Sequence, residues 1–94
     1  HIIYTGDNRK IPSIGFDQIF RNNNVIMGQI IQKKKGELYL YIVPSMDFSQ
    51  QSKLNLLSSL YDRVGKKTIV NYKEVKNIPL SSSGKYNLVI SKIT

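Results

Sequence analysis

The residues best suited to chemistry lie near the end of the chain, in the segment 78–86 with the sequence IPLSSSGKY. Pro79 fixes the backbone ahead of three serines, and Gly84 can adopt a positive φ or admit another surface beside Lys85. A lysine held on such a loop can act as a catalytic cation. The same residue types also describe an ordinary surface turn, and taken alone they favour that simpler interpretation by roughly two to one.

Other common kinds of catalytic site are excluded by the composition. The chain has no cysteine and a single histidine, at position 1, which excludes disulfides, cysteine metal sites and an internal histidine triad. The six acidic residues show no spacing that forces two carboxylates together, which argues against a self-contained acid–base hydrolase. A phosphate-binding P-loop is also excluded, because Pro79 and Tyr86 occupy positions where that motif requires glycine and Ser or Thr.

Length and charge restrict the class of protein further. Ninety-four residues predict one domain, residues 1–94, which is short for a catalytic domain with its own cleft. The first residue is His1 and no apolar leader precedes it, so we expect a piece of a longer polypeptide. No apolar run approaches a membrane span, and no membrane partner is expected. A net charge of +8 favours polyanionic partners.

Two elements are predicted before residue 25. Residues 2–12 contain two short apolar runs around a turn-forming segment and predict a small hairpin. Phe16, Ile19 and Phe20 recur at helical spacing, and the three asparagines at 22–24 end the pattern. A short helix is therefore expected after the hairpin.

The clearest strands are Val25–Gln32 and Glu37–Val43, which the turn at Lys35-Gly36 joins into an antiparallel hairpin. A further strand is predicted from Thr68 to Val75. A last apolar run extends from Leu88 to Ile93.

A long helix is predicted between the second and third of these strands. Asp47 followed by Gln50 resembles a capping box, and Gly65 is suited to end the helix. Its apolar stripe is expected to face the core. The stripe consists of Leu54, Leu57, Leu60, Tyr61 and Val64.

The order strand, helix, strand, strand, helix, strand predicts an α+β fold of the split βαβ, ferredoxin-like type. We expect an antiparallel sheet with two helices on one face, plus a C-terminal tail.

A second function class rests on the run Lys33–Lys35 beside the aromatic strand residues 39–41. Lysines neutralise phosphates and aromatic rings stack on bases, so this pattern suits a free-standing basic module that binds single-stranded RNA or another polyanion. The ribonucleoprotein sheet shares the strand order, but its strand signature of Gly, aromatic and basic residues is absent here. A solubilising charged turn is far commoner, and nucleic acid is not the expected partner.

The pattern of Pro79, four residues and Gly84-Lys85, closing a basic α+β module, resembles the last motif of the adenylate-forming enzymes. This superfamily includes acyl-CoA synthetases, luciferases and nonribosomal-peptide adenylation domains. The closer resemblance is to the branch of phenylacetate-coenzyme A ligase and the CapK-like proteins of capsule biosynthesis. Matching stretches cover nearly the whole chain in order. They run from Lys10 to Phe20, from Gly28 to Val43 and from Val75 to Ser91.

The resemblance implies a mobile C-terminal lid whose partner is the larger, N-terminal ATP-binding domain of the same chain. The whole enzyme would be cytoplasmic and would activate a small carboxylic acid as its acyl-adenylate. This is ATP-dependent, coenzyme A ligase-like chemistry, with a place in capsular polysaccharide biosynthesis. The implied cofactors of the parent are ATP with magnesium, and coenzyme A. The lid alone would bind none of them and would have no turnover. A degenerate lid kept for docking is a further alternative.

The resemblance also implies roles for particular residues. Lys85 would be catalytic, its ammonium lying between the carboxylate and the nucleotide phosphates, and Gly84 would let the loop approach the nucleotide. Gly6 and Arg9, in the first hairpin, are the candidate contacts to the second substrate. No metal ligand is expected in this domain. The chain departs from the family pattern at Leu88, where an arginine often stands.

Overall fold

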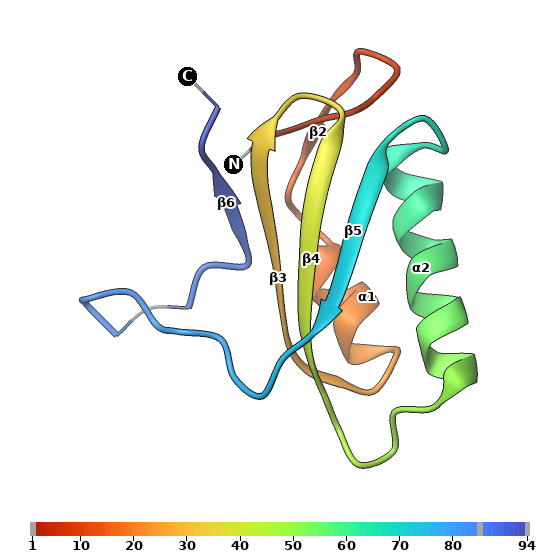
Figure 1. Cartoon of the computed structure of the whole chain (residues 1–94), viewed down its shortest axis with the longest axis vertical. Helices are drawn as coiled ribbons and strands as arrows, with labels where there is room; N and C mark the ends of the chain where they lie inside the picture. The colour runs from red at the N-terminus through yellow and green to blue at the C-terminus, as the bar shows by residue number, and fades with distance from the viewer. Residues whose placement is uncertain (1, 85, 94) are drawn as a thin grey trace.

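Two long strands form the centre of the structure, a computed structural model that describes residues 2–84 and 86–93 (Figure 1). β3 (Val25–Lys34) pairs antiparallel with β4 (Glu37–Pro44), and Gly36 in the turn between them has a φ of 82°. Along β4, Leu38, Leu40 and Ile42 are buried while the residues between them are only half-buried. The strand therefore has one core face and one more open face.

Shorter strands complete the sheet in the order β5-β4-β3-β6. β5 (Ile69–Glu74) pairs parallel with β4, and β6 (Val89–Ser91) pairs parallel with β3. A separate hairpin of β1 (Ile2–Tyr4) and β2 (Lys10–Pro12) lies beside one end of this sheet (Figure 1).

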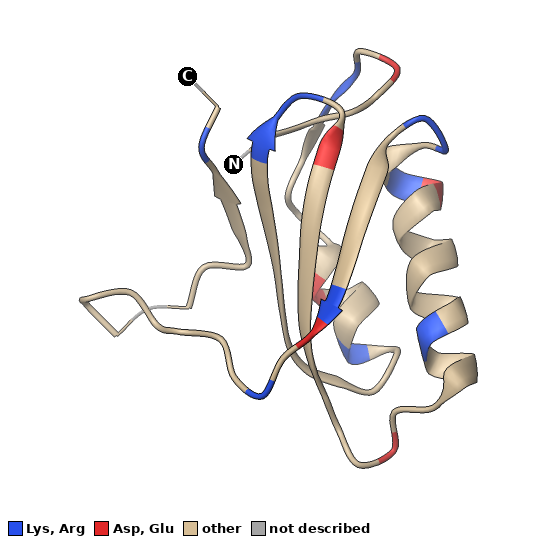
Figure 2. Cartoon of the chain, in the orientation of Figure 1, with Lys and Arg blue, Asp and Glu red and all other residues tan. Residues whose placement is uncertain are grey.

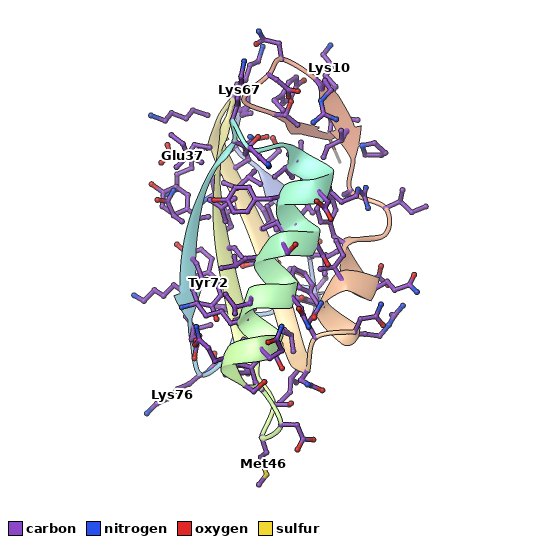
Figure 3. All side chains as sticks on the ribbon, turned by 90° about the vertical axis from the view of Figure 1, so that its right-hand side faces the viewer. Lys10, Glu37, Met46, Lys67, Tyr72 and Lys76 are labelled. Carbon is purple, nitrogen blue, oxygen red and sulfur yellow. The ribbon has the colours of Figure 1, made fainter. Side chains whose placement is uncertain are left out.

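Both helices cover the same face of the sheet (Figures 1 and 3). α1 (Phe16–Arg21) packs on β3, where Gly28 leaves room for the Phe20 ring. A Cβ atom at position 28 would lie 2.6 Å from that ring. α2 (Gln50–Val64) connects β4 to the parallel strand β5. The core between the sheet and the helices consists of Ile3, Phe16, Phe20, Val25, Ile30, Leu38, Leu40, Ile42, Leu56, Leu60, Val64 and Val89.

The predicted α+β class is confirmed, with two helices on one face and an antiparallel central hairpin. The edges of the sheet differ from the fully antiparallel arrangement that was expected. β5 is parallel to its neighbour because the helix α2 returns the chain to the starting end of β4. The predicted C-terminal tail is in part a strand, since Val89–Ser91 adds to the free edge of β3.

Two details of the long helix were predicted wrongly. Its N-cap is Ser49, whose hydroxyl accepts a hydrogen bond from the Ser52 N–H at 3.1 Å, rather than Asp47. Leu54 is 53% exposed, and Leu56 is buried in its place. The rest of the predicted stripe does pack on the core, namely Leu57, Leu60, Tyr61 and Val64. Leu54 does not, because a helix turns by about 100° per residue and Leu54 lies two residues before the buried Leu56.

A buried glutamine attaches the first hairpin to the sheet. Gln32 on β3 is 0% exposed. Its Oε1 accepts a hydrogen bond from the Tyr4 N–H, and its Nε2 donates to the Tyr4 carbonyl, both at 2.8 Å. Nε2 also lies 3.3 Å from the Glu37 carbonyl oxygen. One side chain thus satisfies two backbone groups of β1 that have no strand partner on that side.

Two carboxylates at one end of the domain predict a loss of stability in acid. The Thr5 hydroxyl and Arg9 hold the pKa of Asp7 below its ordinary value of 3.8. Asn71 and Lys34 hold the pKa of Glu37 below 4.5. Because these pKa values are depressed by folding, the stabilisation is complete above the unfolded values and is lost as pH falls through the folded ones. We expect the denaturant midpoint to fall between pH 5 and pH 3. The Asp7→Asn, Glu37→Gln double variant should show a smaller fall, and an equal fall would contradict this assignment.

Candidate functional site

The predicted catalytic lysine belongs to the long connection between β5 and β6, at the lower left of Figure 1. Lys85 itself lies outside the described residues. Its neighbour Gly84 has a φ of 78°, one of the two properties that its residue type allows, and a Cβ atom added there would meet nothing within 4 Å. The glycine next to the lysine therefore borders open space, and another surface could approach it without a clash.

The residue that follows the lysine fastens the connection to the sheet. The Tyr86 hydroxyl accepts a hydrogen bond from the Gly28 N–H at 2.8 Å and donates one to the Gly28 carbonyl. Gly28 lies in β3 beyond the three residues, 30–32, that pair with β6. The Tyr86 hydroxyl thus makes the two hydrogen bonds that a neighbouring strand would otherwise make at this edge. Tyr86 directly follows Lys85 in the sequence.

Two more hydrogen bonds continue this attachment toward β6. The Leu88 carbonyl accepts from the Ile30 N–H at 2.8 Å, and the Asn87 carbonyl accepts from the Gln29 side-chain amide at 2.9 Å. On the other side of the serine run, Ile78 is 5% exposed and anchors the start of the loop. The polar segment between residues 79 and 84 is therefore an exposed loop held at both ends.

A cavity of about 210 Å³ adjoins this attachment, between α1 and the start of β3. Its lining residues are Asp17, Phe20, Arg21, Val25, Ile26, Met27, Gly28, Tyr86 and Leu88. Arg21 and Asp17 form an ion pair of 2.9 Å on α1. Burial raises the pKa of the Tyr86 phenol above its ordinary value, in the direction that keeps the hydroxyl able to donate to Gly28.

The other predicted binding residues lie at the far end of the domain. Gly6 and Arg9 are in the β1–β2 turn at the top of Figure 1, whereas the Gly84 loop is at the lower left. The structure therefore does not bring these two predicted sites together. The Arg9 guanidinium forms a 2.8 Å ion pair with Asp7.

Gly6 has a packing role in addition to any contact with a ligand. Its N–H donates to the Thr68 hydroxyl at 2.9 Å, and a Cβ atom added to it would lie 2.2 Å from the Lys67 carbonyl oxygen. The Gly36 N–H donates to the Tyr4 carbonyl at 3.0 Å, which brings the β3–β4 turn onto the same hairpin. Three turns are thus packed together at this end, namely the β1–β2, β3–β4 and α2–β5 turns. A ligand contact by Gly6 or Arg9 stays a prediction.

A family model for the CapK C-terminal domain matches residues 3–92, which is nearly the entire chain. The chain belongs to this family. Comparisons with curated proteins and with solved structures gave no match. The match to the CapK C-terminal domain includes both the β1–β2 hairpin and the loop that contains Gly84 and Lys85. The predicted membership of a CapK-like family is therefore confirmed.

Two kinds of feature are absent from the described residues of the CapK C-terminal domain. Residues 2–84 and 86–93 contain no group of three or more His, Cys, Asp or Glu side chains that could hold a metal ion. In the same part of the chain, no helix is both long enough and apolar enough to cross a membrane.

Sequence reasoning missed the roles of Tyr86 and Gln32 in the CapK C-terminal domain. Both act on backbone groups far away in the sequence, 58 residues away for Tyr86 and 28 for Gln32. Gln32 gave a usable signal, because an uncharged amide at a core position of a strand must find hydrogen-bond partners. Tyr86 gave no such signal, since it lies in a polar loop.

Loss of the Tyr86 hydroxyl should loosen this edge of the CapK C-terminal domain. The Tyr86→Phe variant leaves the Gly28 N–H and carbonyl without their partner, so we expect about 1 kcal/mol less stability. Amide hydrogen exchange at Gly28 should become at least tenfold faster. Tyr61→Phe on α2 is the matched control and should leave exchange at Gly28 unchanged. Unchanged exchange in Tyr86→Phe would contradict the attachment described here.

Proposed function

We propose that this CapK C-terminal domain is the mobile lid of an ATP-dependent enzyme that activates a carboxylic acid as its acyl-adenylate. The observation that carries the proposal is the loop around Gly84. It is exposed, held at Ile78 and Tyr86, and open beside the glycine. These are the properties required of a loop that must bring one lysine into a site formed by another domain.

The chemistry assigned to Lys85 is electrostatic. A carboxylate oxygen must approach the α-phosphate of ATP, and both groups are anionic. A cation between them lowers the repulsion and stabilises the negative charge that develops as pyrophosphate leaves. A lysine suits this task because it places a point charge at the end of a long side chain. The domain would supply the charge only when it closes over the substrates.

The binding of magnesium and ATP is assigned to the larger domain of the intact protein. ATP, magnesium and a small carboxylic acid would therefore be bound before the lid closes. Coenzyme A is the proposed second substrate. A cytoplasmic location and a place in capsular polysaccharide biosynthesis are parts of the same proposal.

The separation of the two predicted sites supports a lid that presents two different surfaces. The Gly84 loop and the β1–β2 turn lie at opposite ends of the domain (Figure 1). A rotation of the domain could therefore withdraw the lysine loop and bring the hairpin toward the adenylate. In this proposal Gly6 and Arg9 contact the second substrate in the rotated position.

Removal of the domain tests this proposal. An intact protein that carries the domain is compared with a form truncated before residue 1. The truncated form should bind ATP with nearly unchanged affinity and lose acyl-adenylate formation. Adenylate formation at the normal rate without the domain would refute the lid function and would favour a role in docking.

A further inference from the structure

Lysines gather at the end of the domain where the three turns meet (Figure 2). Five lysines lie in or next to these turns and have no carboxylate partner among the described residues. We call them the basic tip. They are Lys10, Lys33, Lys35, Lys66 and Lys67.

The carboxylates and arginines of this end are largely engaged with one another or with the backbone. Asp7 pairs with Arg9, and Glu37 lies 3.3 Å from the Lys34 ammonium. The Arg63 guanidinium donates to the Ile14 carbonyl at 2.9 Å and lies over the Phe16 ring.

The third carboxylate of this end is Asp62, near the end of α2. Even if Asp62 offsets one lysine, a marked positive excess is left at the basic tip.

The kind of cation at the basic tip indicates the kind of anion it would bind. An arginine fork suits the bidentate recognition of a single phosphate, whereas separate lysines suit an extended polyanion.

Aromatic rings hold part of the basic tip in place. The ammonium groups of Lys35 and Lys10 lie 4.9 and 5.8 Å from the centre of the same ring, that of Tyr4. Both charges are thus held near one ring, and an anion that approaches this part of the tip would be attracted by both. The Lys33 ammonium lies 5.1 Å from the centre of the Tyr39 ring, which connects the tip to the sheet.

A second aromatic ring, that of Tyr41, lies beyond Tyr39 on the open face of the sheet. Tyr39 and Tyr41 are two residues apart on β4, alternate with the buried core residues of that strand, and are half-buried. Across the sheet, Tyr39 pairs with Ile31 and Tyr41 pairs with Lys73. Neither helix covers this face (Figures 1 and 3).

We propose that the basic tip and the Tyr39–Tyr41 face together bind single-stranded nucleic acid. The lysines of the tip would neutralise consecutive phosphates, and the two tyrosine rings would stack on bases that leave the tip along β4. A duplex would meet only the lysines, because its bases are already stacked within the helix. This interaction would be separate from adenylate formation and does not depend on the proposed lid function.

The test is fluorescence anisotropy of a labelled 12-nucleotide oligouridylate with the 94-residue chain at 50 mM salt. We expect saturable binding that weakens at least tenfold at 200 mM salt, and at least tenfold weaker binding to a duplex of equal length. The Lys33→Gln, Lys35→Gln double variant should lose about tenfold in affinity. Lys53→Gln with Lys76→Gln removes the same charge elsewhere, on α2 and just after β5, and should lose less than twofold.

The tyrosines distinguish stacking from plain charge attraction. Tyr39→Leu and Tyr41→Leu preserve apolar side chains on the sheet and should each weaken oligouridylate binding by about tenfold. The same variants should not change the binding of inorganic polyphosphate. The proposal fails if the chain does not bind at 50 mM salt, if the two double-lysine variants lose equal affinity, or if neither tyrosine variant affects binding. Circular dichroism of each variant verifies that it is folded.

Discussion

Replacing Lys85 by alanine in an intact protein that carries this domain is expected to lower the rate of acyl-adenylate formation by about 10²- to 10³-fold. A preorganised charge aimed at a developing anion typically contributes an effect of this size. The affinity for ATP should change by less than threefold, because the lysine acts when the lid closes and not when the nucleotide first binds. Rapid-quench measurement of the adenylate formed in a single turnover gives the rate.

The matched control for this variant is Lys92→Ala, an exposed lysine that directly follows β6. It removes the same charge from the domain without touching the Gly84 loop, and it should retain the normal rate. If Lys85→Ala also retained the normal rate of adenylate formation, the catalytic role of this residue would be lost. Equal slowing of both variants would indicate that net charge, and not the position of Lys85, is responsible.

Replacing Gln32 by leucine is expected to cost about 3 kcal/mol of folding stability. The substitution preserves the size of the side chain but leaves the Tyr4 N–H without a partner and the Tyr4 carbonyl with only the Gly36 N–H. An unsatisfied buried group costs about 1–3 kcal/mol. For a domain of this size, such a loss of stability should lower the Tm by roughly 12 °C or more. Differential scanning calorimetry measures the change.

Gln18→Leu on α1 makes the same chemical change at an exposed position and should alter the Tm by no more than about 2 °C. Equal Tm values for Gln32→Leu and Gln18→Leu would contradict the role given to Gln32. The β1–β2 hairpin should be the first segment of the Gln32 variant to lose protection from hydrogen exchange, because the glutamine connects this hairpin to the sheet.

Local sequence patterns were sufficient for most of the elements of the fold. The alternation of residues 38–42 predicted β4 because a strand with one buried face repeats every two residues. The turn at Gly36 and the end of the long helix at Gly65 were also predicted, since glycines commonly occupy both kinds of position. The direction of β5 and β6 could not be predicted, because it depends on which strand each one finds as a neighbour.

The candidate site was only partly predictable for a similar reason. The conformation of Gly84 followed from its own residue type. The attachment of Tyr86 to Gly28 depends on β6 being too short to cover that part of β3, which is a property of the assembled sheet. The packing of Gly6 on the Lys67 carbonyl likewise requires two turns that are far apart in the sequence.

The exchange of labelled pyrophosphate into ATP in the presence of a carboxylic acid substrate tests the proposed lid function most directly. This exchange requires the reversible formation of an acyl-adenylate. The intact protein would be assayed with magnesium, ATP and a panel of aliphatic and aromatic carboxylic acids. The lid account predicts exchange that appears with at least one acid and disappears when Lys85 is replaced by alanine. Exchange that is absent with every acid, or that persists unchanged without Lys85, would contradict it.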